Sequence, residues 1–279
     1  MKFTKIKNDL LLSECENFDP FVSVECGQCF RFNQLNENEY ELFAQDRRLN
    51  IKNKNGSWLF SDIDENEFTE KFLPYFDLER DYSAIIESFS FDENIKKAAY
   101  FGNGIRIFRQ DPWETLISFI ISQNNNIPRI KKIIESLCRL LGEEKNGFYR
   151  FPTAERILEA GTEGLAPIKS GFRAKYIIDA ASKIVSGEIS LEAIKEMDYE
   201  NALNELKKIK GVGDKVANCV LLFGFGFFEA FPIDVWVKRV ITKYYGEAFD
   251  VKRLGKHAGI AQQYLFYYER TIVGGKEQQ

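Results

Sequence analysis

The sequence LKKIKGVGDKVANCVLLFGFGFFEAFPIDVWVKR occupies residues 206–239 and predicts two helices joined by a very short turn. Residues 199–209 carry apolar side chains at helical spacing, and a second apolar-rich helix is expected to start directly after Gly213. Only residues 210–213, Lys-Gly-Val-Gly, lie between them. The glycines permit a positive φ, so the amides of the turn and of the next helix's first residues can lie exposed in a row. Such a row suits an anion, above all a nucleic-acid phosphate.

Two polar residues are expected at helix starts in this stretch. Lys215 falls in the first turn of the second helix, where the positive end of the helix dipole disfavours a cation and so favours the neutral amine that a nucleophile needs. Asp234 follows Pro232 and Ile233 and is the predicted N-cap of a helix over residues 235–244. We expect both helix starts to face one cleft, with a nucleophile beside a carboxylate. A plain turn, a solvated lysine and a capping aspartate would explain the same pattern, so the rest of the chain has to distinguish these interpretations.

The composition indicates a globular protein with one large or two modest domains. The chain has 279 residues, of which 44% are hydrophobic and 14% aromatic. The first ten residues lack the apolar core of a signal peptide, and no stretch approaches the ~18 uninterrupted apolar residues of a membrane span. We therefore expect a soluble, cytoplasmic protein without a membrane partner, associated with the nucleoid if the source is prokaryotic.

The cysteine and histidine content argues against a metal centre or a catalytic triad. Five cysteines, an odd number, fit a reducing compartment. Cys26 and Cys29 have the spacing of half a zinc site, but there is no second such pair and His257 is the only histidine. The pair is therefore expected on a strand as two small apolar thiols, with no metal or cofactor required. One histidine also makes a Ser-His-Asp hydrolase an unsuitable hypothesis.

Charge is distributed unevenly along the chain. The net charge is −4 overall; residues 1–110 carry 14 basic against 20 acidic side chains, and residues 111–279 carry 24 against 22. The weakly basic half is the one that contains the glycine turn. If the ligand is DNA, backbone amides at helix starts must supply much of the phosphate contact.

The order of predicted elements gives an α+β protein. Residues 1–62 predict an antiparallel meander with strands near residues 29–34, 40–44, 48–52 and 57–60, followed by helices over 64–72 and 81–89. From residue 91 onward the pattern is almost wholly helical. Asp111 followed by Pro112 is a helix start signal, a cap and then proline at the first helical position, and helices are expected over residues 113–122, 127–141, 174–184 and 260–271 among others. We predict an antiparallel-sheet domain with flanking helices over residues 1–110, packed on a helical domain over residues 111–279.

Five separated stretches resemble one protein family. They are GQCFRF from residue 27, LISFIISQNNNIPRI from 116, SGFRAKY from 170, GVGDK from 211 and FPIDVW from 231. Together they are similar to the 8-oxoguanine DNA glycosylase/AP lyases of the helix-hairpin-helix Gly/Pro-Asp superfamily, over about residues 27–266. The resemblance implies a sheet domain like that of the TATA-binding protein, a helix-hairpin-helix over about residues 198–226, and base-excision repair of double-stranded DNA.

The resemblance assigns the reaction to two residues. Lys215 would attack C1′ of an extruded 8-oxoguanine nucleotide, displace the base and form a Schiff base, after which elimination of the 3′ phosphate cuts the strand. Asp234 would remain ionised and stabilise positive charge on the sugar. We expect a monomer, because reading one lesion requires no symmetry.

Four residues match the base pocket of the family. The carbonyl of Gly27 would accept the N7–H that distinguishes 8-oxoguanine from guanine. Cys219 and Phe266 would stack on the two faces of the base, and Gln262 would bind its pairing edge. From residue type alone, Cys219 and Phe266 would be interpreted as core residues.

A further set matches the family's DNA contacts. Asn124 would fill the gap left in the duplex, and Arg129 and Arg173 would hydrogen-bond to the cytosine that is left unpaired. Gly211 and Gly213 would present amides to phosphate. The chain departs from the family in two places: the wedge is Phe172 where tyrosine is frequent, and Trp236 replaces a phosphate-binding histidine of eukaryotic members. The family's hairpin also holds an alkali cation on backbone carbonyls, here those of Lys207, Ile209 and Val212.

Two other functions are compatible with the same fold. A monofunctional alkylated-base or adenine glycosylase would use water and would not need Lys215. A non-enzymatic helix-hairpin-helix DNA-binding module would need neither Lys215 nor Asp234. The lysine, together with Gly27 and the two arginines, favours the bifunctional enzyme that preferentially removes 8-oxoguanine opposite cytosine.

Overall fold

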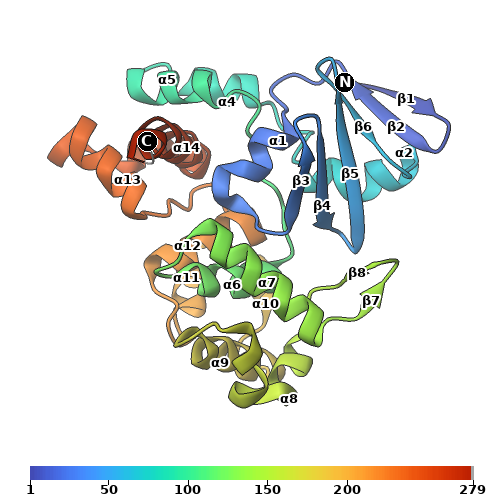
Figure 1. Ribbon diagram of the computed structural model, residues 1–279. Helices are drawn as coiled ribbons and strands as arrows, with labels where there is room; N and C mark the ends of the chain where they lie inside the picture. Colours follow the sequence, from blue (N-terminus) through green and yellow to red (C-terminus); the bar gives the residue numbers. More distant parts are fainter. Residues whose placement is uncertain (278–279) are drawn as a thin grey trace. The chain divides into compact units, whose positions relative to one another are not determined.

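The computed structural model describes residues 1–277 and divides the chain into two compact units (Figure 1). The first unit comprises Met1–Arg109 and Ile233–Gln279, and the second comprises Gln110–Pro232. The change at residue 110 lies where the sequence suggested a boundary. Residues 233–277 differ from the prediction, because they group with the sheet-bearing unit: the last helix packs against helix α5 (Glu93–Phe101) and against the turn that contains Gly27.

The first unit contains a six-stranded antiparallel sheet (Figure 1). In spatial order its strands are β1 (Lys2–Ile6), β2 (Asp9–Ser13), β6 (Ser57–Phe60), β5 (Arg47–Lys54), β4 (Glu39–Ala44) and β3 (Phe32–Asn36). Alternate side chains of the inner strands are buried, among them Leu10, Leu12, Leu49 and Ile51. The predicted meander is present in β3 to β6, and β1 and β2 extend it beyond the prediction.

Short helices cover the buried face of the sheet with aromatic side chains. They are α1 (Pro20–Ser23), η1 (Val24–Gln28), α2 (Glu65–Glu67), η2 (Phe68–Phe72) and α3 (Leu73–Tyr75). Helix α4 (Tyr82–Ser88) follows them in the chain. Phe60, Phe68 and Phe76 contact one another with ring centroids 4.8–6.3 Å apart. Asp64 and Asp81 cap α2 and α4 by accepting backbone N–H bonds, at the starts of the two segments predicted as helices over residues 64–72 and 81–89.

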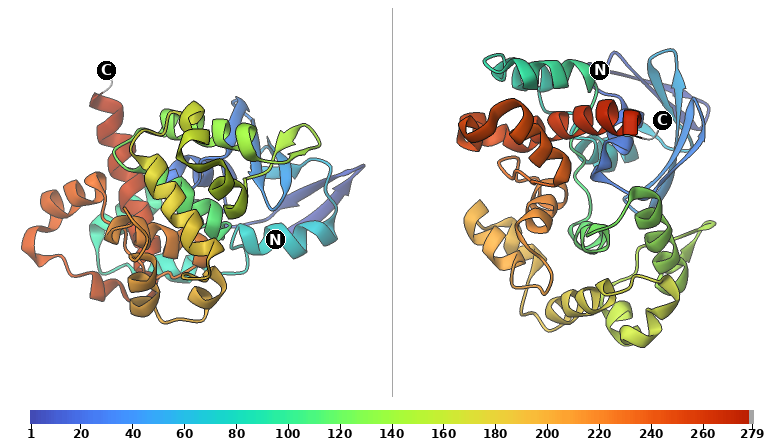
Figure 2. Two further views of the ribbon diagram at one scale, coloured as in Figure 1. Left: turned by 90° about the horizontal axis from the view of Figure 1, so that it is seen from below. Right: turned by 60° about the vertical axis from the view of Figure 1, so that its left-hand side comes forward.

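The remaining helices of the first unit come from distant parts of the chain. They are α5 (Glu93–Phe101), α13 (Val235–Val240), η5 (Ile241–Tyr245), η6 (Gly246–Ala248), η7 (Val251–His257) and α14 (Ala258–Glu277). The long helix α14 lies beside α5, as the right-hand view of Figure 2 shows, and also contacts α13 and η1. This packing brings residues 258–273 next to the N-terminal turn η1.

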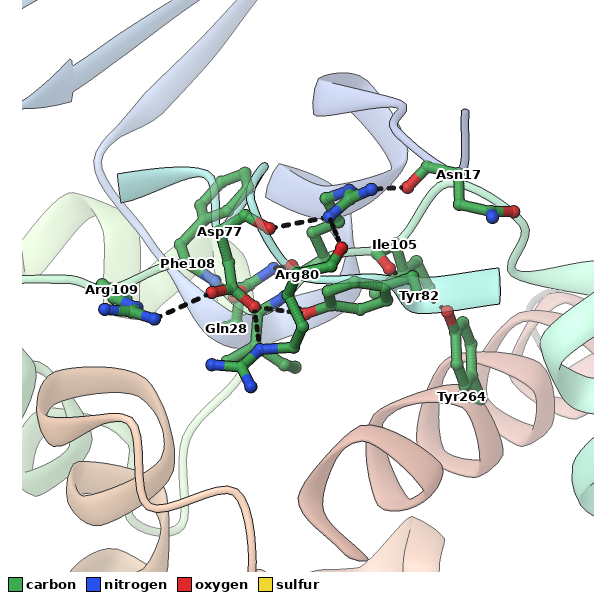
Figure 3. A network of polar contacts seen from close by, with 11 residues as sticks. Asn17, Gln28, Asp77, Arg80, Tyr82, Ile105, Phe108, Arg109 and Tyr264 are labelled. Carbon is green, nitrogen blue, oxygen red and sulfur yellow. Dashed lines mark hydrogen bonds and ion pairs between the residues drawn. The ribbon is translucent and has the colours of Figure 1, made fainter. Parts of the chain in front are cut away.

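A buried polar network fixes the segment that leaves the first unit (Figure 3). The carboxylate of Asp77 accepts from Arg80 at 2.7 Å, Arg109 at 3.1 Å and the Tyr82 hydroxyl at 3.2 Å. The Arg106 guanidinium donates to the carbonyls of four residues, Glu16, Asn17, Asp77 and Arg80. Because these charges and carbonyls are paired, their burial is compatible with a stable fold.

At the first of its two crossings between the units, the chain changes hydrogen-bond partners within one residue. The Arg109 N–H donates to the Tyr75 carbonyl of the first unit at 2.8 Å. The Gln110 N–H donates to the Phe223 carbonyl of the second unit at 2.9 Å.

The second unit is mainly helical. Its elements are α6 (Pro112–Ser122), α7 (Ile127–Leu141), the hairpin of β7 (Glu144–Lys145) and β8 (Phe148–Tyr149), α8 (Ala154–Gly164), η3 (Ala166–Ile168), α9 (Arg173–Val185), α10 (Leu191–Lys195), α11 (Tyr199–Leu206), α12 (Asp214–Val220) and η4 (Leu221–Phe225). Helix α6 begins at the predicted Asp111–Pro112 signal and is buried over seven consecutive residues. It packs against α12, the helix that follows the glycine turn. In the part of the chain that the structure describes, no helix is long and apolar enough to cross a membrane.

Candidate active site

The turn between α11 and α12 has the predicted tight geometry. Gly211 has a φ of +82°, and a Cβ at this position would lie 2.4–2.6 Å from ring atoms of Tyr176. The Lys210 N–H donates to the Asp179 carboxylate at 2.8 Å, which fixes the entry to the turn. Gly213 is the N-cap of α12, so no side chain from the cap accepts the first amides of that helix. These amides therefore lie at an exposed helix start, as the phosphate-site hypothesis requires.

Lys215 lies in the first turn of α12 on a face that is largely apolar. Its Nζ is 4.9 Å from the ring centroid of Phe119 on α6, and the side chain is half-buried. Cys219 lies one turn later on the same helix and is buried, so the two side chains share a helix face. An amine above an aromatic ring is held by a cation–π contact when charged and remains a free donor or nucleophile when neutral.

Asp234 is the N-cap of α13, as predicted. Its Oδ1 accepts from the backbone N–H of Trp236 at 3.0 Å and of Val237 at 2.8 Å. These bonds fix the carboxylate at the helix start. Asp234 belongs to the first unit and Lys215 to the second, so the expected pairing of the two side chains stays a prediction.

Asn218 connects the lysine-bearing helix to the segment that leads to Asp234. Its Oδ1 accepts from the Tyr199 hydroxyl at 2.7 Å and from the Phe231 N–H at 3.0 Å. Its Nδ2 donates to the Asp214 carbonyl at 2.8 Å. Sequence reasoning missed this residue, although a lone amide among the apolar side chains of 216–223 was a signal for it.

In the first unit, Gly27 and the predicted wall residues of α14 lie together. Gly27 has a φ of +85°, and a Cβ there would lie 3.1 Å from the Phe266 ring and 3.0 Å from Arg270 Nη1. The Arg270 guanidinium lies over one face of Phe266, 5.2 Å from the ring centroid. Gln262 is 4% exposed, and no described residue donates to its buried Oε1. A buried acceptor without a protein partner is the group expected where a polar ligand binds.

The interpretation of the Cys26–Cys29 segment as a strand was wrong. Residues 24–28 form the turn η1, and strand β3 begins only at Phe32. The reason is the positive φ of Gly27, which turns the chain before it can extend. The Cys26 thiol donates to the Ser23 carbonyl at 3.0 Å, and burial raises its pKa to about 11. Among the described residues, no three His, Cys, Asp or Glu side chains are grouped so that they could hold a metal ion.

Four of the predicted DNA-contacting residues of the second unit lie in or close to two loops, at residues 123–126 and 169–172. Asn124 is exposed with a φ of +46°, Phe172 is 49% exposed, and exposed Arg129 donates to the Lys169 carbonyl at 3.4 Å. Arg173 is 3% exposed and donates to the carbonyls of Gln123 and Asn124, the latter at 2.9 Å. Its burial, together with the charge of Arg129, lowers the pKa of Arg173.

Arg173 therefore shapes the loop that carries Asn124, and its guanidinium lies 4.5 Å from the Phe172 ring centroid. Trp236 has a comparable neighbour, with Arg239 4.8 Å from its ring centroid. At the suggested cation site, the Ile209 carbonyl accepts from the Val212 N–H at 3.0 Å. The cation site stays a prediction.

Comparison with known proteins identifies relatives of both parts of the chain. Residues 10–116 match the family described as 8-oxoguanine DNA glycosylase, N-terminal domain, and residues 117–253 match the HhH-GPD superfamily of base excision DNA repair proteins. The N-glycosylase/DNA lyase of Saccharomyces cerevisiae is 40% identical over 158 residues, 51% of this chain and 42% of the yeast protein. The probable N-glycosylase/DNA lyase of Methanothermobacter thermautotrophicus is 32% identical over 244 residues, 76% of this chain and 78% of that protein.

Solved structures match the whole fold. A structure of MBOgg1 in complex with a low-affinity DNA ligand has a TM-score of 0.91 and 41% identity, covering 98% of this chain and 100% of the other. The Clostridium acetobutylicum 8-oxoguanine glycosylase/lyase, in complex with double-stranded DNA containing cytosine opposite 8-oxoguanine, has a TM-score of 0.89 and 38% identity. That match covers 97% of this chain and 98% of the clostridial one.

Proposed function

We infer the function from one premise: the chain belongs to the 8-oxoguanine DNA glycosylases of the HhH-GPD superfamily. On that premise we propose that it removes 8-oxoguanine from double-stranded DNA in base-excision repair and then cuts the strand at the abasic site. The observation that carries the proposal is the position of Lys215. It lies in the first turn of α12, directly after the glycine turn, and its half-buried side chain lies over the Phe119 ring. A lysine in this position supplies the covalent chemistry that a glycosylase/lyase requires and a water-using glycosylase does not.

The proposed reaction begins with a bond from the neutral Lys215 amine to C1′. The bond between C1′ and N9 breaks as this bond forms, and the departing base takes up a proton. Loss of the amine proton and opening of the sugar ring give the imine. Removal of a C2′ proton then expels the 3′ phosphate and cuts the strand. Asp234, held at the start of α13 by two backbone amides, is proposed to stabilise the positive charge that develops on the sugar.

The proposed base pocket combines one backbone acceptor with one side-chain amide. The Gly27 carbonyl would accept the N7–H of 8-oxoguanine, whereas guanine would place a lone pair against it. Gln262 supports the assignment, because its buried Oε1 is available to a donor on the pairing edge of the base. Phe266 would stack on one face of the base, because Arg270 already covers the ring's other face, and Cys219 would stack on the opposite side.

DNA contacts are proposed for residues that lie at exposed helix starts and loops. Amides near Gly211 and Gly213 would bind a phosphate, and Trp236 would offer its indole N–H to another. Asn124 and Phe172 would enter the gap in the duplex. Arg129 and Arg173 would bind the unpaired cytosine, and the loop contacts of Arg173 indicate that it acts with most of its donors already used.

A trapping experiment tests the catalytic role. Borohydride reduction of a reaction on duplex with 8-oxoguanine opposite cytosine should give a covalent protein–DNA adduct, because it reduces the imine. Lys215→Gln should abolish the adduct. Lys210→Gln is the matched control, because Lys210 is an exposed lysine in the same turn whose backbone N–H, not its side chain, donates to Asp179, and it should retain the adduct.

Wild-type protein that releases the base without an adduct would instead support a monofunctional glycosylase. Equal binding of damaged and undamaged duplex without base release would support a DNA-binding module. Arg129→Ala should relax the preference for cytosine; unchanged relative rates opposite all four bases would contradict that role.

We propose that the protein acts as a cytoplasmic monomer, nucleoid-associated in a prokaryote. A single lesion offers one asymmetric site, so a second copy would add no contact to it. Light scattering should give the mass of one chain for the free protein and of one chain plus one duplex for the complex; a mass that includes two chains would contradict the proposal.

A further inference from the structure

Two buried glutamine side chains, one on each side of Gly27 in the fold, hold the turn that contains Gly27 through hydrogen bonds. We propose that Gln263 and Gln28 are positioning residues that fix the direction of the Gly27 carbonyl and thereby set the discrimination between 8-oxoguanine and guanine. This inference rests on the proposed function, in which that carbonyl reads the N7–H of the base.

Gln263 fixes the peptide unit that precedes Gly27. Its Nε2 donates to the Cys26 carbonyl at 2.5 Å, and the residue is 2% exposed. Gln263 belongs to α14, which also carries Gln262 and Phe266. The bond therefore fixes the position of the turn relative to α14. This helix carries Phe266, which is proposed to stack on the base, and Gln262, which is proposed to bind its pairing edge.

Gln28 fixes the other end of the turn. It is 0% exposed; its Nε2 donates to the carbonyls of Ser23 and Arg106, both at 2.8 Å, and its Oε1 accepts from the Phe108 N–H at 2.7 Å. The carbonyl of Gly27 belongs to the peptide unit that ends at Gln28. Anchoring Gln28 thus constrains the plane in which that carbonyl lies.

The segment that binds the Gln28 side chain is itself held by hydrogen bonds. Phe108 and Arg106 belong to the segment held by the Asp77 network, and Figure 3 shows Gln28 beside this network. Arg270 adds a contact from α14, because its Nη2 donates to the Glu25 carbonyl. The carbonyls of residues 23, 25 and 26 are therefore each engaged by a side chain.

Gly27 needs such external constraints because of its residue type. Glycine has the widest range of backbone conformations, so its own φ and ψ do not hold a carbonyl in one direction. The two bases differ at N7 by one hydrogen, and a hydrogen bond weakens steeply with angle. A displacement of the carbonyl by about 1 Å is enough to reduce a reaction on the order of 100-fold.

Both glutamines act through the N–H donors of an amide. Gln263→Glu replaces the donor with an oxygen that faces the Cys26 carbonyl, and Gln263→Met keeps the length of the side chain without a donor. Gln28→Glu keeps the acceptor for Phe108 and loses both donated bonds. Tyr264→Phe is a matched control, since Tyr264 is a buried neighbour on α14 whose hydroxyl donates to the Ile105 carbonyl at 3.3 Å rather than to a carbonyl of residues 23–27.

The experiment compares two reactions of each purified full-length variant. Single-turnover excision of 8-oxoguanine opposite cytosine requires the Gly27 carbonyl, whereas cleavage at a preformed abasic site has no base to read. We expect Gln263→Met and Gln28→Glu to lose at least tenfold in excision and to change abasic-site cleavage by less than twofold. Tyr264→Phe should change neither rate by more than twofold.

Hydrogen exchange gives a second readout that does not depend on activity. Peptides covering residues 24–30 should exchange faster in Gln263→Met than in wild type, while peptides from α6 and α12 keep their protection. Unchanged exchange of residues 24–30, or equal loss of both activities, overturns the positioning role. Wild-type protein that cuts abasic sites but leaves 8-oxoguanine in place overturns the proposed substrate, and the positioning role with it.

Discussion

The turns at Gly27 and Gly211 share a positive φ and differ in how their surroundings hold them. Their φ angles are +85° and +82°. The neighbours of Gly27, Cys26 and Gln28, are fully buried, whereas Lys210 before Gly211 is exposed and the buried Val212 is followed by the exposed Gly213. The first turn is held by buried glutamine side chains; the second is held at its entry by Asp179 and is followed by a helix start without a side-chain cap.

This difference corresponds to two kinds of recognition. A carbonyl that reads one hydrogen on one base has to be fixed in direction, and buried amide contacts provide that. A phosphate accepts hydrogen bonds over a broad range of directions, so a row of amides at a helix start is sufficient. We therefore expect substitutions in the two turns to separate base selection from DNA affinity.

Gly211→Ala is expected to have the largest effect on folding. The methyl group would lie 2.4–2.6 Å from the Tyr176 ring, and the positive φ is unfavourable for alanine. Strain of this kind and overpacking together cost about 3 kcal/mol in the free energy of unfolding. Urea denaturation measures this loss, and a variant as stable as wild type would show that the ring moves aside at little cost.

Gly27→Ala is expected to cost less stability and to be selective in activity. The new methyl group would contact Phe266 and Arg270 at 3.0–3.1 Å, so neighbours need to shift by only tenths of an ångström, and the loss should be about 2 kcal/mol. Excision of 8-oxoguanine should fall far more than cleavage of abasic sites. Parallel loss of the two activities would remove the distinction drawn between the turns.

Gly213→Ala is expected to leave stability within about 0.5 kcal/mol of wild type. Its φ of −99° suits any residue, and no atom lies within 4 Å of the added methyl group. The methyl group would obstruct a phosphate at this helix start, so duplex affinity should fall for damaged and undamaged DNA alike. Fluorescence anisotropy measures both affinities; a loss confined to lesion DNA would argue against phosphate binding.

Alkylation of Cys26 is the smallest expected effect and tests the burial of the first turn. Burial raises the thiol pKa from its ordinary value of 9.0 to about 11. The folded protein should therefore react about tenfold faster for each unit of pH up to about pH 11, whereas an ordinary thiol levels off above pH 9. Peptide mapping by mass spectrometry measures the rate, with urea-unfolded protein as the reference. Rapid alkylation at pH 7 in the folded state would show that the turn opens.

The predictable parts of the fold were those with local signals. The starts of α6 at Asp111–Pro112 and of α13 at Asp234 were confirmed, because a capping side chain bonds to amides two or three residues away. Strands β1 and β2 were not recognised as separate elements. In β1 most side chains are exposed at the sheet edge, so no clear alternation of apolar residues marks it.

The candidate site could be predicted only where spacing along the sequence alone determines which residues lie together. Lys215 and Cys219 share a helix face through their spacing, and the glycine turn follows from four letters. The contact of Gln263 with the Cys26 carbonyl joins residues 237 positions apart, and nothing local signals it. The prediction of a strand at Cys26 and Cys29 was wrong for the same reason, since the hydrogen bonds that stabilise the turn come from residues 105–108 and from α14.

The crossing at Arg109 and Gln110 gives the chain little freedom at this point. Each of these residues is tied by its N–H to a different unit, so only the backbone bonds of Arg109 lie between the two ties. The chain crosses a second time between Pro232 and Ile233. We infer a tether one residue long at the first crossing, which a glycine inserted after Arg109 would lengthen without removing any contact within either unit.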